Sequence, residues 1–379
     1  MQPRLKISSY SQPQPSLVLP YTLLCIFTCI VLSMCYTINR TVTEPYMDEL
    51  FHVDQVQRWC DTNSKWGNWN NKITTLPGLY LYSLSLVHTA HRIIYKLYSN
   101  DVSDISNDSI WCNLHTLRLS NLLLLPATIY LLYQILQQIN PIYRTSHNIH
   151  IYKLLIIITH PIIYFYIFLY YTDLLSLFTV LLSVHLYLNN NLKLSGVVCT
   201  ASVLTRQTNI VWCIFLLGWS VIHKYTVFST LVVQSNSNNN QPQQSIQLLH
   251  PTQWSQLLPA FINLIRLCLN NFITIIKQHA TYMLCILCFI VFVQYNGSIV
   301  VGDKTNHSAS LHVVQLFYWF AYTAYTLVIT QALTIHSVNS FIVHLYNNKI
   351  NTIIAVCAII ALISVDYQIH HIYTSIHIQ

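Results

Sequence analysis

Five carboxylates of this 379-residue chain fall in one short polar stretch, although the whole chain holds only eleven. They are Glu44, Asp48, Glu49, Asp54 and Asp61. The stretch runs from Glu44 to Tyr80 between two apolar runs, and it begins with E-P-Y-M-D-E-L-F-H-V-D-Q-V-Q-R-W-C over 44–60. A carboxylate at a membrane surface can take a proton from a substrate hydroxyl. Asp48 and Glu49 are therefore candidates for a general base.

Three further polar groups interrupt apolar sequence. They are Asp173 at the end of L-Y-Y-T-D, the run Arg206-Gln207-Thr208-Asn209, and the loop G-D-K-T-N-H over 302–307, which holds Asp303, Lys304 and His307. An ionisable group near hydrocarbon is costly unless it is paired or functional. Cations can hold an anion, and amides and hydroxyls suit sugar hydroxyls. Together with a base, these groups fit transfer from a lipid phosphate.

Each group taken alone also fits a structural role. Asp48 and Glu49 are consistent with charges at a helix start. Asp173 and Arg206 are consistent with a buried ion pair, and 302–307 with a solvated turn. The sequence leaves these alternatives open.

The elements that must position these groups are apolar. Charged residues make up 8% of the chain and hydrophobic residues 54%, which is typical of a membrane protein. We predict an all-α, polytopic membrane protein with about nine transmembrane helices, because runs long enough to cross a bilayer recur. The predicted spans are 17–37, 73–94, 113–138, 151–170, 171–189, 195–222, 280–301, 311–335 and 350–370.

The predicted organisation is a single integral membrane domain over 1–379. The polar stretch forms a first loop over 38–72, and the first apolar run is interpreted as a retained helix. Between 223 and 279 the composition changes, and the Asn- and Gln-rich run Q-S-N-S-N-N-N-Q-P-Q-Q-S predicts a disordered extramembrane insert. Lysines and arginines occur on both sides of the first span, so charge does not decide the orientation.

Several classes of function lack support. The net charge of +7 is spread over loops, which argues against a nucleic-acid partner. No Cys/His zinc spacing occurs, and most cysteines are interpreted as packing residues, so we predict no metal and no cofactor. Cys60 and Cys112 lie outside the spans or at their edge, and a disulfide between them cannot be argued from sequence.

Six collinear motifs resemble the dolichyl-phosphate-glucose α-1,2-glucosyltransferases, and together they cover most of 40–320. The motifs are the 44–60 sequence quoted above, I-T-T-L-P-G-L-Y (73–80), L-R-L-S-N-L-L (117–123), F-L-Y-Y-T-D (168–173), R-Q-T-N-I-V-W (206–212), and G-D-K-T-N-H (302–307) with L-H-V-V-Q-L-F-Y (311–318).

The resemblance implies a polytopic enzyme of the endoplasmic reticulum membrane, of the GT-C class, with its first loop in the lumen. Such an enzyme adds the third, terminal glucose to the diglucosylated lipid-linked oligosaccharide used for protein N-glycosylation. The donor is dolichyl-phosphate-glucose, so the expected partners are this lipid, the dolichol-linked oligosaccharide and membrane lipids.

The resemblance also implies an inverting displacement that needs one base. We assign Asp48 as that base and Glu49 as the reserve, because neighbours on a helix point about 100° apart and one of the two faces the substrate. His52 lies four residues beyond Asp48 and is expected to orient it. The phosphate is assigned to Arg206 and Lys304, with His307 nearby, and the substrate-binding set is completed by Gln207, Asn209 and Asp303.

The chain departs from the family pattern in two places. Where the family usually shows Trp-Asp-Pro, it has Trp69-Asn70-Asn71. It also stops at Gln379, before the Asp-Asn-Arg-His-Tyr segment and further helices, so we expect a truncated or incomplete sequence. The alternatives are therefore a catalytically impaired homologue, or a transporter or lipid scramblase whose polar groups line a path.

Overall fold

The computed structural model describes residues 18–60, 69–98, 111–139, 147–236, 257–304, 313–329 and 347. No strand occurs among these residues, which confirms the all-α prediction for the described part of the chain. The chain divides into one unit over Met1–Lys304 and a second over Thr305–Gln379. The described helix of the second unit is α14 (Val313–Ile329).

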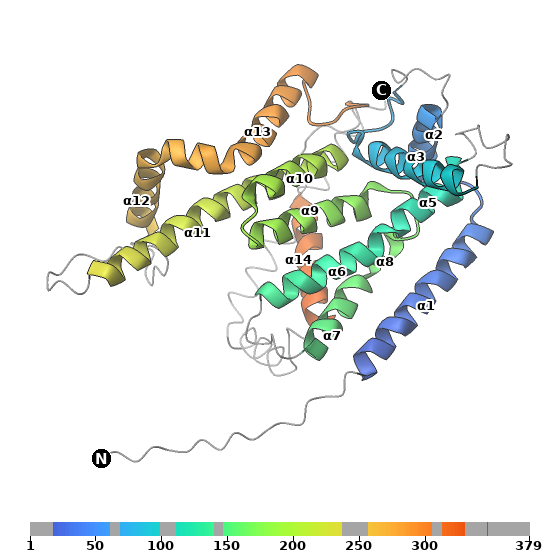
Figure 1. Cartoon of the computed structure of the whole chain (residues 1–379), viewed down its shortest axis with the longest axis horizontal. Coiled ribbons are helices and arrows are strands. Elements are labelled where there is room, and N and C mark those ends of the chain that lie inside the picture. Colours follow the sequence, from blue (N-terminus) through green and yellow to red (C-terminus); the bar gives the residue numbers. More distant parts are fainter. Residues whose placement is uncertain are drawn as a thin grey trace, which may run out of the picture. The chain divides into compact units, whose positions relative to one another are not determined.

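The described part of the first unit is a succession of helices (Figure 1). In chain order they are α1 (Val18–Thr41), α2 (Glu49–Cys60), α3 (Gly78–Tyr98), α5 (Leu114–Leu122), α6 (Leu124–Ile139), α7 (His147–Ile158), α8 (Pro161–Tyr166), α9 (Thr172–Leu188), α10 (Leu192–Thr205), the 3₁₀ turn η2 (Gln207–Asn209), α11 (Ile210–Asn236), α12 (Leu257–Asn270) and α13 (Phe272–Asn296).

Three helical segments of the described chain are long and apolar enough to cross a membrane. They are Tyr21–Thr41, Leu114–Ile139 and Phe272–Asn296. Three more apolar helices, within α9, α10 and the start of α11, are shorter. The prediction of membrane-crossing helices is thus supported, whereas the count of nine spans is not confirmed. The predicted span 350–370 lies outside the described residues.

The predicted span over 73–94 is not among these candidate segments. Near the start of α3, the ring of Tyr80 lies 5.7 Å from that of Trp59 in α2. Farther along α3, His91 lies 5.8 Å from Trp111, the neighbour of Cys112, which forms a disulfide with Cys60 at the end of α2. Both contacts thus lie at the C-terminal end of α2, and α3 packs against that end.

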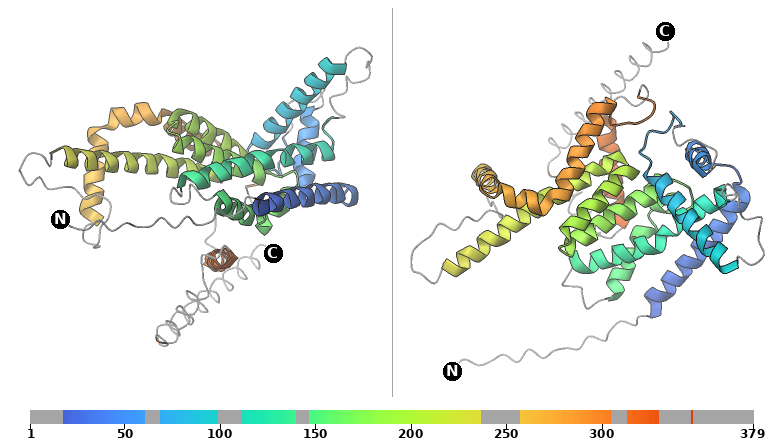
Figure 2. Two further views of the ribbon diagram at one scale, coloured as in Figure 1. Left: turned by 60° about the horizontal axis from the view of Figure 1, so that its bottom comes forward. Right: turned by 45° about the horizontal axis from the view of Figure 1, so that its top comes forward.

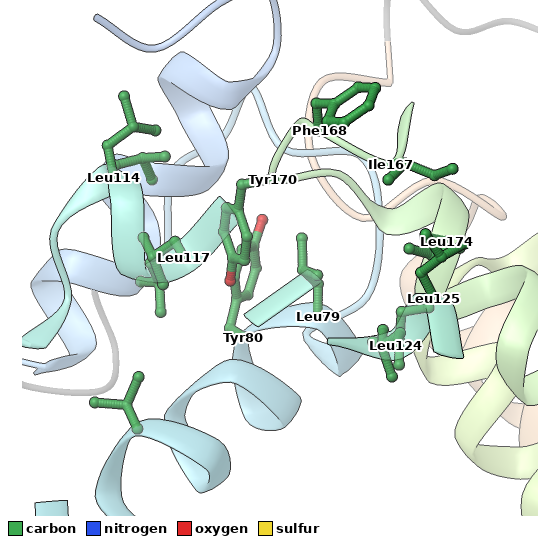
Figure 3. Close-up of a cluster of buried hydrophobic side chains, with 14 of the residues drawn as sticks. Leu79, Tyr80, Leu114, Leu117, Leu124, Leu125, Ile167, Phe168, Tyr170 and Leu174 are labelled. Atoms are coloured by element: carbon green, nitrogen blue, oxygen red, sulfur yellow. The ribbon is translucent and has the colours of Figure 1, made fainter. Parts of the chain in front are cut away.

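A hydrophobic core joins α2, α3, α5 and the segment that leads into α9. Leu79 and Tyr80 of α3 meet Leu117 of α5 and Tyr170, and all four are buried (Figure 3). Tyr170 lies 2.6 Å from Ser83 through its hydroxyl, so this buried polar group is paired. The core fixes the loop helices against the membrane-crossing α5–α6 segment.

A second core joins α10, α11 and α13, and α10 packs against α13 (Figure 2). Tyr282 donates from its hydroxyl to Ser195 at 2.6 Å. A Cβ on Gly196 would lie 2.2 Å from Thr281 Oγ1, so the close approach of α10 and α13 requires glycine there. This packing holds the end of α10, where Arg206 follows.

The prediction of a disordered insert over 223–279 is wrong at both ends of this range. Helix α11 continues to Asn236, and α12 and the start of α13 occupy 257–279. The apolar runs on either side of the Asn- and Gln-rich sequence propagate as helices, because each added residue gains a backbone hydrogen bond. Most of the Asn- and Gln-rich sequence lies outside the described residues.

Candidate active site

Asp48 lies at the start of α2 and is exposed. Its backbone carbonyl accepts from Phe51 N–H and His52 N–H at 3.0 and 3.2 Å, which begins the helix. Its own backbone N–H donates to the Tyr171 hydroxyl at 2.7 Å. Met47, just before it, has a φ of 53°, and non-glycine residues in this region concentrate at functional sites. The turn thus presents the Asp48 carboxylate to solvent at a helix N-terminus, which stabilises its negative charge.

Glu49, the reserve base, is completely buried. Arg118 donates to both of its oxygens, from Nε to Oε1 at 3.0 Å and from Nη2 to Oε2 at 2.6 Å. The backbone N–H groups of Tyr46 and Tyr170 also donate to Oε2 and Oε1, at 2.9 and 2.6 Å. Four donors hold this carboxylate in place, and none of its surface is exposed. The structure therefore gives Glu49 an anchoring role instead of the proposed reserve role.

Arg118 is a further charged residue of the candidate site that the sequence analysis did not assign. It is 1% exposed and also donates from Nη1 to the carbonyl of Val42 at 2.8 Å, which fixes the chain between α1 and α2. Sequence did carry a signal for it. An arginine inside the apolar run L-R-L-S-N-L-L needs a buried acidic partner.

A disulfide between Cys60 and Cys112 holds the other end of α2. Their Cα atoms are 6.5 Å apart, within the range for such bonds. Gln57 donates from Nε2 to the carbonyl of Cys112 at 3.1 Å, beside the disulfide. Helix α2 is thus fastened at both ends to one segment, 111–122, which fixes the position of Asp48.

His52 is buried behind Asp48. Its Nδ1 lies 2.6 Å from the Tyr80 hydroxyl, and its ring meets the edge of Tyr171 at 5.9 Å. Burial lowers the pKa of His52 from 6.5 to about 4, although the negative charges of Asp48 and Glu49 oppose this shift. His52 is therefore neutral near pH 7. Its Nδ1 pairs with Tyr80, so the expected orienting bond to Asp48 is replaced by an electrostatic influence.

Arg206 and Asp173 form an ion pair, with Nη1 and Oδ1 2.5 Å apart. The pair is not fully buried, because 42% of the Arg206 side chain and 26% of the Asp173 side chain remain exposed. Arg206 lies between α10 and η2, and Asp173 lies in the first turn of α9. Tyr171, which accepts the backbone bond of Asp48, lies two residues before Asp173, so the ion pair adjoins the start of α2. Arg206 keeps free surface with which to meet an anion.

Gln207 and Asn209, predicted to bind substrate, are buried and tie elements together. Gln207 donates to the carbonyl of Thr74 at 2.8 Å. Asn209 donates to Ser176 Oγ at 2.7 Å and to the carbonyl of Ser202 at 3.0 Å. These bonds fix the turn that carries Arg206, so both amides act on the site through their neighbour.

The polar loop after α13 docks on the loop before α3. Asp303 N–H donates to the carbonyl of Asn71 at 2.8 Å, and Val301 N–H to that of Thr74 at 3.2 Å. A Cβ on Gly302 would lie 2.2 and 2.3 Å from the carbonyl oxygens of Asn71 and Ile73, so the contact requires glycine. The polar loop that contains Asp303 and Lys304 is thereby joined to the loop before α3.

Lys304, predicted to bind phosphate, donates to the carbonyl of Asn296 at 2.5 Å. This bond satisfies one of the last carbonyls of α13, a common place for a lysine. Lys304 is also exposed. His307 lies outside the described residues, so its predicted role is not addressed.

Comparison with known proteins gives the family. The sequence profile of the DIE2/ALG10 family matches residues 42–375. The chain belongs to the DIE2/ALG10 family. No solved structure matches it.

Curated members of the family are similar over most of this chain. A protein of Rattus norvegicus named Dol-P-Glc:Glc(2)Man(9)GlcNAc(2)-PP-Dol alpha-1,2-glucosyltransferase is 34% identical over 288 residues, which is 76% of this chain and 58% of that protein. Proteins of the same name from Homo sapiens and Candida albicans are 32% and 29% identical, over 76% and 82% of this chain and 58% and 62% of their own length. This chain thus spans about three fifths of these relatives.

Asn70, where the chain departs from the usual family pattern, is held by α2. Its backbone N–H donates to Gln55 Oε1 at 2.8 Å. Its side-chain amide lies 3.4 Å from Asp54, which also pairs with Arg58 at 2.7 Å. The loop keeps its position without a carboxylate at residue 70, and Asp54 supplies a carboxylate beside it.

The described residues contain no group of three His, Cys, Asp or Glu side chains that could hold a metal ion. Absence of a metal requirement therefore stays a prediction. The candidate site contains an exposed carboxylate, Asp48, a partly exposed cation, Arg206, and a buried neutral histidine, His52. Such a site can accept a proton and hold an anion.

Proposed function

We propose that this protein is an inverting glucosyltransferase of the GT-C class. It transfers glucose from dolichyl-phosphate-glucose to the diglucosylated dolichol-linked oligosaccharide and forms the terminal α-1,2 linkage. The observation that carries the proposal is the open carboxylate of Asp48, set at a helix start by Glu49 and Arg118. The names of the curated relatives support the substrates.

The reaction is a single displacement at the anomeric carbon of the donor. The 2-hydroxyl oxygen of the acceptor's terminal glucose forms the new bond to this carbon, while the bond from carbon to phosphate oxygen breaks. The hydroxyl proton passes to the Asp48 carboxylate, and dolichyl phosphate leaves with the electron pair. A positioned base of this kind contributes about 10²–10⁴-fold to the rate.

Arg206 stabilises the leaving phosphate, whose negative charge grows as the bond breaks. Its pairing with Asp173 in the free protein keeps the guanidinium oriented. Its exposed surface remains available to a phosphate oxygen. His52 stays neutral, so it adds no charge that would compete for the phosphate.

The proposed location is the endoplasmic reticulum membrane, with about nine spans in the GT-C arrangement and the site facing the lumen. Support for this side comes from the disulfide between Cys60 and Cys112, because such bonds form in oxidising compartments. The disulfide adjoins α2, so Asp48 lies on the same side.

The test supplies membranes carrying the chain with dolichyl-phosphate-glucose and the diglucosylated acceptor, and weighs the glycan by mass spectrometry. The expected result is a gain of one hexose with the unchanged protein and none with Asp48→Asn. A variant that keeps full transfer without this carboxylate would refute the assignment of the base. Absence of transfer by the well-expressed, unchanged chain would favour the catalytically impaired homologue.

A transporter or scramblase is the second candidate. It requires carboxylates within the spans, whereas the three candidate spans contain no Asp or Glu. A flux assay with labelled lipid in vesicles tests it, because a scramblase moves lipid between leaflets without any change in glycan mass.

A further inference from the structure

An apolar groove of about 510 Å³ lies between α1 and the α7–α8 region. One wall is formed by Ile38 and Val42 near the end of α1, and the other by Pro161 and Phe165 of α8. Phe165 is exposed. Met34 and Ile38 belong to a candidate membrane span, so part of the groove opens at the depth of the lipid chains.

The groove ends at the anchor that positions Asp48. Tyr46 and Leu169 both line it. Tyr46 donates from its backbone N–H to Glu49, and Leu169 immediately precedes Tyr170, which donates to the same carboxylate. The groove is thus continuous with the candidate active site and not an isolated surface feature.

We propose that this groove binds the polyisoprenoid chain of the donor, a polyprenyl-linked sugar phosphate. The proposal rests on the proposed function. Burial of such a chain against apolar side chains is favourable by about 0.8 kcal/mol per CH₂ group. The groove therefore aligns the lipid with its phosphate directed toward Asp48 and Arg206.

The occupant is the donor chain, because of the covalent distance between each lipid and its reacting atom. In the donor, one sugar and one phosphate separate the chain from the anomeric carbon. In the acceptor, the whole oligosaccharide separates the lipid from the reacting hydroxyl. The groove ends beside the donors to Glu49, close to Asp48. It therefore fits the donor, in which the lipid is separated from the reacting atom by the shorter distance.

A matched pair of threonines makes the test specific. Thr159 lines the groove, and its hydroxyl donates to the carbonyl of Leu155 at 2.7 Å. Thr28 lines a second apolar groove of about 360 Å³ between α1 and the α5–α6 segment, and its hydroxyl donates to the carbonyl of Leu24 at 2.9 Å. Both side chains are exposed. Thr159→Trp fills the proposed site, and Thr28→Trp fills the other.

The first readout is kcat/KM for two donors, one with a full-length polyprenyl chain and one with two isoprene units. Thr159→Trp is expected to lower kcat/KM about tenfold for the long-chain donor, as loss of two buried CH₂ groups predicts, and to leave the short-chain donor unchanged. Thr28→Trp should change neither. Any of three results would overturn the proposal. Thr159→Trp could lower kcat/KM equally for both donors, the two variants could have equal effects, or only the KM for the acceptor could rise.

The second readout does not depend on transfer. A long-chain polyprenyl phosphate with a photoreactive group on its chain is added to membranes, and the labelled peptides are mapped. Labelling of the α1 and α8 walls that Thr159→Trp abolishes supports the groove, even where no hexose is transferred and the proposed function fails. Labelling elsewhere, or none in the groove because other protein segments fill it, overturns the groove while leaving the function intact.

Discussion

Arg118 donates two hydrogen bonds to the carboxylate of Glu49, while Asp48, one residue earlier, leaves its own carboxylate open to solvent. Two adjacent acids in the sequence therefore have opposite surroundings. Glu49 is fixed in position by four donors, whereas the Asp48 carboxylate is open to a substrate. This division of roles leads to the first two predictions.

Asp48→Asn should abolish transfer and preserve the fold. The amide keeps the shape of the side chain and the backbone bond to Tyr171 but cannot accept the hydroxyl proton. We expect the rate to fall about 10²–10⁴-fold. Initial rates measured beside melting temperatures check this, and a melting temperature that falls along with the rate would point to misfolding instead.

Glu49→Gln should destabilise the protein. The substitution leaves the buried guanidinium of Arg118 without its counter-charge, which costs about 3–5 kcal/mol. The matched control is Asp54→Asn, which breaks the exposed pair with Arg58 and should cost no more than about 1 kcal/mol. Thermal unfolding of the two variants in detergent compares them, and equal stabilities would contradict the anchoring role of Glu49.

Arg206→Gln should weaken the handling of the leaving phosphate. Loss of one charge-stabilising donor is expected to lower kcat/KM about 10²–10³-fold. Asp173→Asn is the control, because it removes the partner of Arg206 and keeps the cation. Kinetics at several donor concentrations distinguish the two, and identical losses would mean that the ion pair matters only for structure.

Stability should fall below about pH 6.5 because of His52. The unfolded chain binds a proton on this histidine near its ordinary pKa of 6.5, whereas the folded protein does so only near pH 4. The unfolded state is therefore favoured progressively between pH 6.5 and pH 4, by up to about 3 kcal/mol. Melting temperatures of the unchanged protein and of His52→Gln across this range test it. A variant with the same acid sensitivity would assign the effect to another group.

Gly302→Ala should impair the site through loop docking. The added Cβ meets two carbonyl oxygens at 2.2 and 2.3 Å, so the 301–304 loop must move away from the loop before α3. The control is Gly218→Ala in α11, where no atom lies within 4 Å of the new Cβ and alanine should stabilise the helix by about 0.5–1 kcal/mol. Activity and melting temperature of both variants check this, and an unaffected Gly302→Ala protein would show that the contact is dispensable.

Sequence predicted the helical class and the polar stretch, because composition and charge clustering are local properties. It ranked Asp48 before Glu49 as the base, but it did not predict that Glu49 is buried. The difference between the two acids depends on Arg118, which is 69 residues away along the chain, and no local pattern reports such a pairing.

The predicted span at α3 is not confirmed. Its sequence contains many Leu, Tyr and Val residues, but His91 and Arg92 interrupt the apolar run. Gln207 and Asn209 carry side chains suited to sugars, but both are buried, and Gln207 bonds to the loop before α3 while Asn209 bonds to α9 and α10. Exposure is a property of packing, and sequence alone does not supply it.

The two fastenings of α2 also set an order of events during synthesis. Cys60 and Cys112 are 52 residues apart, and Glu49 and Arg118 are joined across 69. Both partners of each fastening lie within the first 118 residues, so they are made while more than half of this chain is still to be synthesised. Helix α2 can therefore be fastened at both ends on the nascent chain, before the later helices assemble.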